Sequence, residues 1–345
     1  MLSFVHDVPS QRVVFGAGAL AGIGEEAERL GLARALVVAT PGSGARLGGT
    51  VADLLGARSA GLHAQAVVHV PTAVAQAGVA AARDAMADGL IACGGGAAIG
   101  LAKAIARDTG LPILALPTTY SGSEATPIFG MTDGERKLTG RDPKALPRTI
   151  VYDPDLTIGL PAAVSAASGM NAIAHCVEAL WADARTPVTM ALASEAMRRF
   201  AENLPAVVAD GADRETRAQC LAAAWLAGTV LSAGTGLHHK LAHVLGGLGL
   251  PHAQTHAIIL PHVMRFNLEA APQANARLRE ALGSERPADA VADMLEKFPI
   301  PQRLREVGFD GGKEDFVANE IAAAAIKSPR PVSAGDVRAI LAAAG

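Results

Sequence analysis

The stretch LIACGGGAAIGLAKA, residues 90–104, joins an apolar run to a helix-forming run through three consecutive glycines. This order predicts a buried strand, a tight turn and a helix. Gly94, Gly95 and Gly96 let the backbone approach a ligand closely, and their N–H groups with the helix N-terminus offer a phosphate site. Glycines also serve such turns with nothing bound, and the spacing differs from the usual G-x-G-x-x-G fingerprint.

Apolar runs alternate with helical periodicity on both sides of this stretch. Strands are predicted at 12–15, 34–39, 66–70, 89–93 and 112–116, and helices at 19–30, from the TPGSG turn to about 55, at 73–87 and at 97–108. Strands and helices of these lengths in alternation predict a parallel sheet with helices on both faces. The Gly-, Pro- and charge-rich segment 126–150 is expected to be an extended excursion or a hairpin.

The hydrophobic pattern of the sequence changes near residue 150. From about residue 161 onward helical periodicity dominates and β-branched strand runs disappear. A chain of 345 residues is also longer than one ordinary compact domain. We therefore predict an α/β domain at 1–155 and an all-helical domain at 156–345.

Charge and cysteine content limit the classes of partner. The net charge of -3 makes nucleic acid and anionic membranes poor candidates. The N-terminal text lacks a signal-peptide pattern, and we expect no membrane span. Cys93, Cys176 and Cys220 are odd in number and embedded in apolar text, so we expect reduced thiols and a cytoplasmic protein.

A hydroxyl-rich loop follows the next predicted strand, in LPTTYSGSEAT (116–126). It carries Thr118, Thr119, Ser121 and Ser123 at the carboxyl end of that strand, the edge where open α/β sheets bind ligands. A solvated loop of Ser and Thr is the ordinary alternative. Two such loops after neighbouring strands favour a cofactor site.

Thr40 and Lys103 complete the predicted cofactor residues. Thr40 ends the second strand, where enzymes selective for NAD often carry an acidic residue that repels a 2′-phosphate. A threonine cannot repel it, so both NADH and NADPH are expected to be accepted. Lys103 lies in the helix that follows the glycines.

Six of the ten histidines fall within GLHHKLAHVLGGLGLPHAQTHAIILPHV (236–263). His239 and His243 are neighbours on one helix face, as are Asn171 and His175 in SGMNAIAHCVEAL. These pairs, with His252 on the following loop, could converge on one point. Three imidazoles with an open fourth place are typical of catalytic zinc. A single histidine is more often an ordinary core or surface residue, but this density favours a functional site.

Several strings taken together resemble the iron-containing (group III) alcohol dehydrogenase superfamily. They are RVVFGAGAL, GGGAAIGLAKA, LPTTYSGSEATP, VYDPDLT, SGMNAIAHCVEAL and HHKLAHVLGGLGLPHA. The resemblance implies a dehydroquinate synthase-like fold, with a dinucleotide-binding α/β domain, a helical domain and a cleft between them. It also implies an NAD(P)H-dependent oxidoreductase and a homodimer.

Departures from the family pattern narrow the resemblance. Metal-dependent members carry an Asp and three His as ligands, and Asn171, His175, His239 and His252 stand at those places. A neutral amide cannot supply the anionic oxygen that a divalent cation favours. Gly100 replaces a family Asp, and the loop TTYSGSE is short. With GRDPKALPRTIVYDP (140–154), these features resemble maleylacetate reductase, the branch that works without a metal.

The resemblance implies reduction of the C=C bond of maleylacetate, a dicarboxylate, to 3-oxoadipate in the catabolism of aromatic compounds, with no metal. His243 matches the family's non-ligand histidine near the nicotinamide. Either His243 or His239 would be the principal oxyanion partner and proton donor. The full catalytic set is expected to be His243, His239, His175, His252 and Asn171, with Lys240, His238 and His256 for the substrate carboxylates.

Three other functions remain open from the sequence. The nearest is an iron- or zinc-dependent alcohol dehydrogenase that tolerates Asn171 as a ligand. A zinc hydrolase built on the histidines would need no dinucleotide, and the glycine triplet argues against it. A catalytically inactive sugar- or nucleotide-binding module is the third, against which the dense histidine set argues.

Overall fold

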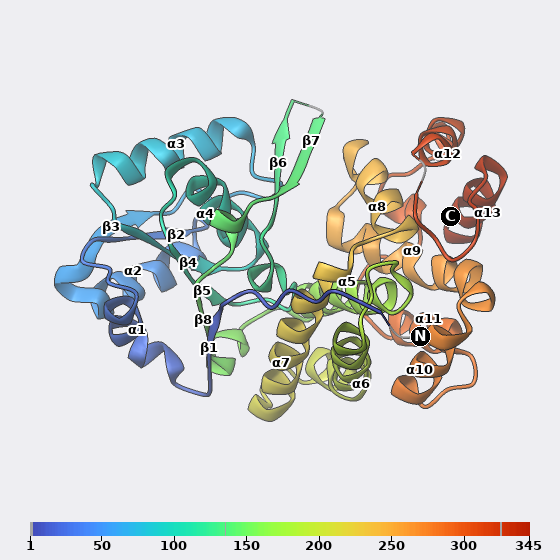
Figure 1. The fold of residues 1–345 in the computed structure, drawn as a ribbon, viewed down its shortest axis with the longest axis horizontal. Coiled ribbons are helices and arrows are strands. Elements are labelled where there is room, and N and C mark those ends of the chain that lie inside the picture. Colours follow the sequence, from blue (N-terminus) through green and yellow to red (C-terminus); the bar gives the residue numbers. More distant parts are fainter. Residues whose placement is uncertain (1–2, 135, 325) are drawn as a thin grey trace. The chain divides into compact units, whose positions relative to one another are not determined.

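The computed structural model describes residues 3–134, 136–324 and 326–345 (Figure 1). It divides into two compact units, an α/β unit of Asp7–Leu160 and a helical unit of Pro161–Gly345 that also includes the N-terminal segment up to His6. The division falls after Leu160, whereas the sequence places it after residue 155. Sequence reasoning also assigns the N-terminal segment to the other domain. In the structure, Nδ1 of His6 lies 3.3 Å from Oγ1 of Thr186, within the helical unit.

The α/β unit is built on a parallel six-stranded sheet. Its order is β1 (Arg12–Phe15), β8 (Thr149–Tyr152), β5 (Ile113–Pro117), β4 (Gly89–Gly94), β2 (Ala35–Ala39) and β3 (Ser59–His63). The chain runs outward from β2 to β3 and then returns to β4 on the other side of β2. Ligands of open α/β sheets bind at the carboxyl ends of the two strands where the order reverses in this way. The predicted parallel sheet is confirmed, and its reversal lies between β2 and β4.

Helices cover both faces of this sheet (Figure 1). They are α1 (Ile23–Arg29), α2 (Ser43–Leu55), α3 (Thr72–Asp84) and α4 (Gly96–Thr109). Side chains of α1 and α2 share one core with alternate strand residues, including Val37, Ile91 and Leu114, as the period of two along a strand requires. On α3, a Cβ at Gly78 would lie 2.7 Å from Cδ1 of Ile105 on α4, so the two helices are in close contact there.

The predicted strand at 66–70 is wrong. The third strand is Ser59–His63, which pairs with β2 up to Val38↔His63. The stretch AVVHV instead forms a turn, because His69 and Val70 have φ of 64° and 43° and Val68 is exposed. Its β-branched residues favour a strand by propensity, but pairing with a neighbour decides which segment joins the sheet. The predicted helix at 19–30 is also split, into η1 (Ala19–Gly22) and α1.

The excursion after β5 contains the hairpin expected within 126–150. Strand β6 (Ile128–Asp133) pairs antiparallel with β7 (Arg136–Arg141), from Ile128↔Arg141 to Asp133↔Arg136. The short helical turns of this unit are η2 (Gly56–Arg58), η3 (Ser123–Ala125), η4 (Pro143–Ala145) and η5 (Pro154–Thr157). The hydroxyl-rich loop predicted at 116–126 therefore includes η3 and leads directly into the hairpin.

The second unit is helical over its described residues, as predicted. Its helices are α5 (Ala162–Trp181), α6 (Pro187–Ala209), α7 (Arg214–Val230), α8 (Leu237–Gly247), α9 (His252–Asn267), α10 (Pro272–Leu282), α11 (Pro287–Glu296), α12 (Glu314–Ala323) and α13 (Ala334–Ala344), with the turns η6 (Leu231–Ala233), η7 (Leu268–Ala270) and η8 (Leu304–Val307). Helix α5 is the centre of the unit, since every residue from Ser165 to Trp181 is buried. It packs against α6, α7 and α9, which places its polar side chains inside the protein.

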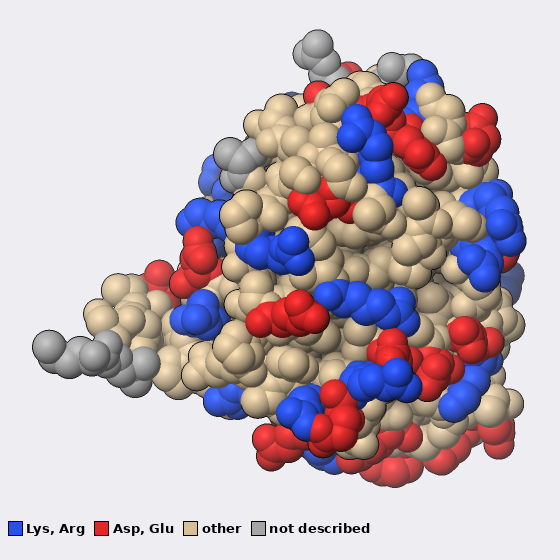
Figure 2. All heavy atoms as spheres, turned by 90° about the vertical axis from the view of Figure 1, so that its right-hand side faces the viewer, with Lys and Arg blue, Asp and Glu red and all other residues tan. Residues whose placement is uncertain are grey.

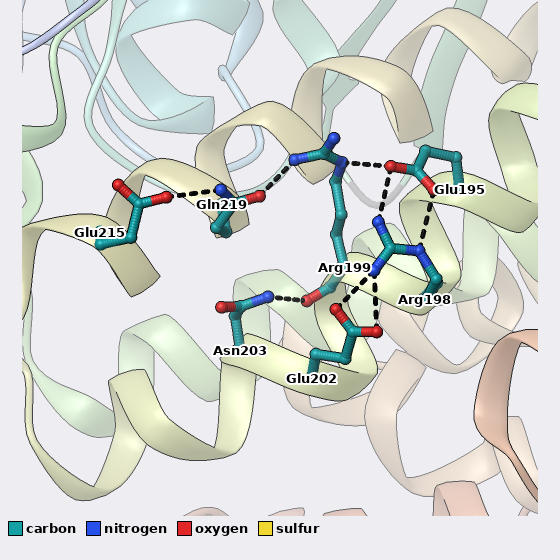
Figure 3. A network of polar contacts seen from close by, with 7 residues as sticks. All are labelled: Glu195, Arg198, Arg199, Glu202, Asn203, Glu215 and Gln219. Atoms are coloured by element: carbon teal, nitrogen blue, oxygen red, sulfur yellow. Dashed lines mark hydrogen bonds and ion pairs between the residues drawn. The ribbon is translucent and has the colours of Figure 1, made fainter.

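A polar network joins α6 to α7 at the surface (Figure 3). Arg198 binds Glu195 at 2.8 Å and Glu202 at 2.6 Å, and Arg199 connects Glu195 to Gln219 on α7. These side chains are partly exposed, so each ion pair contributes at most about 1 kcal/mol to stability. The network therefore orders side chains at the surface and contributes little to stability.

The face drawn in Figure 2 carries basic and acidic side chains side by side, without a continuous field of one sign. Among the described residues, no single helix has the length and apolar composition to cross a membrane. One pair, Arg214–Ala233 with Leu237–Gly247, meets those two criteria only when both segments are joined, and it is bent by 99°.

Candidate active site

The glycine triplet forms the turn between β4 and α4. Gly94 has a φ of 140°, which side-chain-bearing residues rarely adopt. A Cβ on Gly95 would lie 2.6 Å from Cγ2 of Thr119, and one on Gly96 would lie 4.0 Å from Oγ of Ser121. The two loops predicted to bind the cofactor are therefore adjacent, at the carboxyl edge of the sheet. The N-terminus of α4 opens at this turn and presents backbone N–H groups suited to a phosphate.

The hydroxyl-rich loop at 116–126, called the hydroxyl loop below, is hydrogen-bonded to the glycine turn. Two of its polar atoms have no hydrogen-bond partner among the described residues. The amide of Thr118 donates to the carbonyl of Gly94 at 3.2 Å. Oγ of Ser121 and Oγ of Ser123 are buried and have no hydrogen-bond partner among the described residues. Buried polar atoms without a partner are uncommon in proteins and are satisfied by a bound ligand or water. Half-buried Thr40 follows β2 at the same edge, one residue beyond the pair Ala39↔Cys93.

The side chain of Lys103 is directed at the backbone of the hydroxyl loop. Its Nζ donates to the carbonyl oxygens of Ser123, Thr126 and Ile128 at 2.5, 2.7 and 2.7 Å. Burial lowers the pKa of Lys103 to about 7, and the charge of Glu124 opposes this shift. All three ammonium hydrogens are thus used by backbone. Lys103 therefore braces the hydroxyl loop against α4, and its part in cofactor binding stays a prediction, to which these bonds assign an indirect form.

Glu124 and Tyr152 form a second buried contact beneath the hydroxyl loop, which sequence reasoning missed. The Tyr152 hydroxyl donates to Oε1 of Glu124 at 2.6 Å. Burial raises the pKa of Glu124, although the hydrogen bond from Tyr152 and the charge of Lys103 act in the opposite direction. The acidic residue within a Ser/Thr loop, followed by a Tyr in the next strand, carried no distinctive spacing that would have indicated the pair.

Six imidazoles come together inside the helical unit. His175 comes from α5, His238, His239 and His243 from α8, and His252 and His256 from α9. Neighbouring ring centroids are 4.4 Å apart for His252–His256, 4.8 Å for His239–His256, 5.0 Å for His175–His239 and 5.9 Å for His243–His252. These six residues are called the histidine cluster below. Residues far apart in sequence thus form one group of convergent side chains.

The structure brings together most of the predicted catalytic residues. His175, His239, His243 and His252 all belong to the histidine cluster, although His252 is the first residue of α9 and does not lie on a loop. Asn171 lies one helical turn before His175, and its buried Oδ1 has no partner among the described residues.

The three residues predicted to bind substrate carboxylates differ in their surroundings. His238 donates from Nε2 to the carbonyl of His256 at 2.9 Å and is fully buried, so it ties α8 to α9. Its Nδ1 has no hydrogen-bond partner among the described residues, so the substrate contact predicted for His238 stays a prediction that only this nitrogen could fulfil. His256 is also fully buried, yet neither of its ring nitrogens has a partner within the described part of the chain. Lys240 is half-buried on α8.

Burial and mutual repulsion keep part of the histidine cluster neutral. Burial, followed by the charges of neighbouring imidazoles, holds the pKa of His175 and that of His256 well below the usual value. Burial also lowers the pKa of His238, against the opposing effect of Glu178. These three rings are therefore neutral at pH 7. They offer lone pairs or single N–H groups, and any positive charge in the cluster belongs to another ring.

Glu178, on α5, is the buried acid of this site, and sequence reasoning did not single it out. Its carboxylate accepts hydrogen bonds from the amides of Gly236 and His238 at 2.9 and 2.8 Å, and lies 2.6 Å from Nδ1 of His239. The sequence did hold a signal. Asn171, His175 and Glu178 are spaced by four and three residues, which places all three on one face of a helix.

The donor atoms suit a transition metal only in part. Nitrogens of His238, His239 and His256 lie within 4.8 Å of one another, and imidazole is a good ligand for zinc or iron. The amide of Asn171 stands where metal-dependent relatives are expected to have a carboxylate. The carboxylate of Glu178 is already occupied by N–H donors. The cluster could hold a divalent ion through neutral nitrogens, but it lacks an anionic ligand.

Comparison with known proteins agrees with this geometry. Residues 9–154 match the iron-containing alcohol dehydrogenase family, and 165–345 match the C-terminal region of the Fe-containing alcohol dehydrogenase family. Maleylacetate reductase 2 of Cupriavidus pinatubonensis is 48% identical over 96% of this chain and 94% of its own length. Maleylacetate reductase of Pseudomonas sp. (strain P51) is 42% identical with the same coverage.

A solved structure gives the same result for the fold. The crystal structure of maleylacetate reductase from Agrobacterium tumefaciens aligns with a TM-score of 0.95 and 42% identity, covering 100% of this chain and 98% of that one. Both the sequence relatives and the structure match nearly the whole chain. The chain, which is similar to these maleylacetate reductases over nearly its whole length, therefore belongs to the iron-containing alcohol dehydrogenase family.

Proposed function

We propose that this enzyme reduces the C=C bond of maleylacetate to give 3-oxoadipate, with NADH or NADPH as the hydride donor. The observation that carries the proposal is the histidine cluster, which is packed beside Asn171 and tied to Glu178. It occurs in a chain whose relatives named maleylacetate reductase are 42–48% identical. A dense set of N–H donors suits a reaction in which negative charge develops on oxygen.

The chemistry follows from the structure of the substrate. Maleylacetate has a C=C bond conjugated to a ketone. Hydride from nicotinamide C4 adds to the alkene carbon farther from the ketone, and the electron pair of the C=C bond moves to leave an enolate on the ketone oxygen. A proton then bonds to the carbon next to the ketone, and the ketone re-forms. The net change is one hydride and one proton, which gives 3-oxoadipate and oxidised cofactor.

The α/β unit provides the cofactor residues in this proposal. The glycine turn of Gly94–Gly96 and the hydroxyls of Thr118, Thr119, Ser121 and Ser123 bind the diphosphate and ribose, and Lys103 acts by bracing their loop. The unpartnered Oγ atoms of Ser121 and Ser123 support this assignment. Neutral Thr40 allows a 2′-phosphate at the neighbouring strand end, so both cofactors are used.

The helical unit provides the proton and the oxyanion partner. Nδ1 of His239 lies 2.6 Å from Oε2 of Glu178, and His243 on the next turn of α8 is its neighbour at 6.2 Å between ring centroids. One of these two donates a hydrogen bond to the enolate oxygen. His175, His252 and Asn171 shape the site, and Lys240 and His256 meet the substrate carboxylates.

We propose that the reaction needs no metal ion. The enone is already activated, so hydrogen-bond donors can stabilise the enolate, whereas oxidation of a saturated alcohol benefits more from a Lewis acid. The absence of an anionic ligand at Asn171 supports the same conclusion. Nitrogens of His238, His239 and His256 would hold an ion if one bound, and the ion would then polarise the substrate carbonyl.

We further propose a cytoplasmic homodimer. Three free, buried cysteines support a reducing compartment. Strand β1 lies at one edge of the sheet, where backbone groups are available for pairing with a second copy. Light scattering on the purified protein tests the second statement, since it measures the mass of the particle against the 35.0 kDa of one chain.

The direct test is an absorbance assay of NADH and NADPH oxidation with maleylacetate, on protein of measured metal content. We expect turnover with both cofactors and 3-oxoadipate as the product. Oxidation of simple alcohols that depends on added iron, without turnover of maleylacetate, would instead identify a metal-dependent alcohol dehydrogenase.

A further inference from the structure

We infer that Glu178 is a positioning residue, which accepts a hydrogen bond from Nδ1 of His239 and so fixes the orientation and the tautomer of that ring. This inference rests on the proposed function. It goes beyond it by naming the group that determines which ring nitrogen of His239 bears the fixed hydrogen and which one can serve the substrate.

The hydrogen bonds of Glu178 identify its carboxylate as an acceptor. The backbone amides of Gly236, His238 and His239 can only donate, and they lie 2.9, 2.8 and 3.4 Å from its oxygens. These amides belong to the first turn of α8, where the helix dipole favours an anion. Burial raises the pKa of Glu178, while His238 and the three amides act in the opposite direction. The carboxylate thus caps α8 from a neighbouring helix.

The remaining contact of this carboxylate fixes the protonation pattern of His239. Oε2 of Glu178 is 2.6 Å from Nδ1 of His239, and both side chains are buried, with 1% and 7% of their surface exposed. Because the carboxylate is an acceptor, Nδ1 bears a hydrogen. The same hydrogen bond sets the orientation of the ring, so Nε2 is the atom through which His239 can act on the substrate.

The space around Glu178 is built to keep this geometry. A Cβ on Gly236 would lie 3.1 Å from Oε1 of Glu178 and 2.8 Å from the carbonyl oxygen of Lys327. Gly236, which directly precedes α8, is therefore packed too tightly for any side chain. The carboxylate also borders a cavity of about 170 Å³, which Trp181, Gly234 and Gly236 line with it and to which no imidazole contributes. His239 thus contacts a fixed carboxylate that approaches it from outside the histidine cluster.

The test is the variant Glu178→Gln, assayed with maleylacetate and NADH at one pH. We expect kcat to fall roughly 10–100-fold, with the KM for NADH unchanged. Glu178→Asp, which keeps an anionic acceptor, should recover most of kcat. Glu195→Gln, on the surface of α6, is the matched control and should leave kcat unchanged.

A measurement on the wild-type enzyme covers the case in which Glu178→Gln does not fold. Nitrogen NMR of protein with labelled histidine reports which ring nitrogen bears hydrogen, and the His239 signal is found by its loss in His239→Gln. We expect hydrogen on Nδ1. A His239 ring with hydrogen on Nε2 and none on Nδ1 overturns the inference, as does a folded Glu178→Gln with wild-type kcat. Failure of the wild-type enzyme to reduce maleylacetate would instead refute the proposed function, and the NMR result would still decide the tautomer.

Discussion

Replacing Gly95 with alanine tests whether the glycine turn and the hydroxyl loop form one cofactor site. The backbone of Gly95 has φ -84° and ψ -161°, an extended conformation that alanine also adopts, so the effect is one of contact. The new Cβ would lie 2.6 Å from Cγ2 and 3.0 Å from Oγ1 of Thr119. Ordinary carbon contacts are about 3.5–4.0 Å, so Thr119 must move by roughly 1 Å. Overpacking of this kind costs about 1–3 kcal/mol.

The displaced loop carries Ser121 and Ser123, so the change should appear in cofactor binding more than in chemistry. We expect the Kd of NADH, measured by fluorescence titration, to rise at least about 10-fold, equivalent to about 1.4 kcal/mol. The rescue variant is Gly95→Ala with Thr119→Ser, which removes Cγ2 and should recover most of the affinity. Gly49→Ala, where a Cβ meets nothing within 4 Å, is the neutral control. Wild-type affinity in Gly95→Ala would refute the reasoning.

Three further predictions follow from other parts of the molecule. Lys103→Met removes three hydrogen bonds to backbone carbonyls. It should lower the free energy of unfolding by about 3–5 kcal/mol, measured by denaturant titration. An unchanged midpoint of the unfolding curve would contradict the bracing role. Thr40→Asp should lower kcat/KM for NADPH roughly 10–100-fold while sparing NADH, and equal losses with both cofactors would remove Thr40 from the 2′-phosphate site. Because the pKa values of His175, His238 and His256 are lowered from 6.5 in the folded state, the unfolded chain binds more protons just below that pH. Each ring should then reduce stability by up to about 1.4 kcal/mol per pH unit as the pH falls below 6.5, and a thermal stability that stays constant from pH 7 to 5 would disagree.

The sequence predicted the α/β unit well where hydrophobic periodicity and packing agree. The strands at 12–15 and 89–93 and the helix at 97–108 correspond to β1, β4 and α4 with shifts of at most one residue at either end. The strand Ser59–His63 was missed because SAGLH has no β-branched residue and no alternation, and only its pairing with β2 makes it a strand. Periodicity records which face of a segment is buried, but it does not record which neighbour the segment pairs with.

In the site too, the sequence pattern predicted which side chains share a helix face, but not which hydrogen bonds they make with the backbone. The spacing of His239 from His243 and of Asn171 from His175 placed each pair on one helix face, and the density of histidines indicated convergence. The bonds of Lys103 to Ser123, Thr126 and Ile128 could not be inferred, because backbone carbonyls have no sequence signature. Residue type alone also could not show that His238 uses its Nε2 on a backbone carbonyl.

The central claim is that imidazoles, held by a buried carboxylate, do here what a metal ion does in other members of the family. The most direct measurement is the rate of maleylacetate reduction by protein whose metal content is determined before and after dialysis against a strong chelator. We expect full activity when the number of metal ions per chain is far below one, and no gain in activity when zinc or ferrous iron is added. Activity that disappears with the metal and returns with either ion would contradict it.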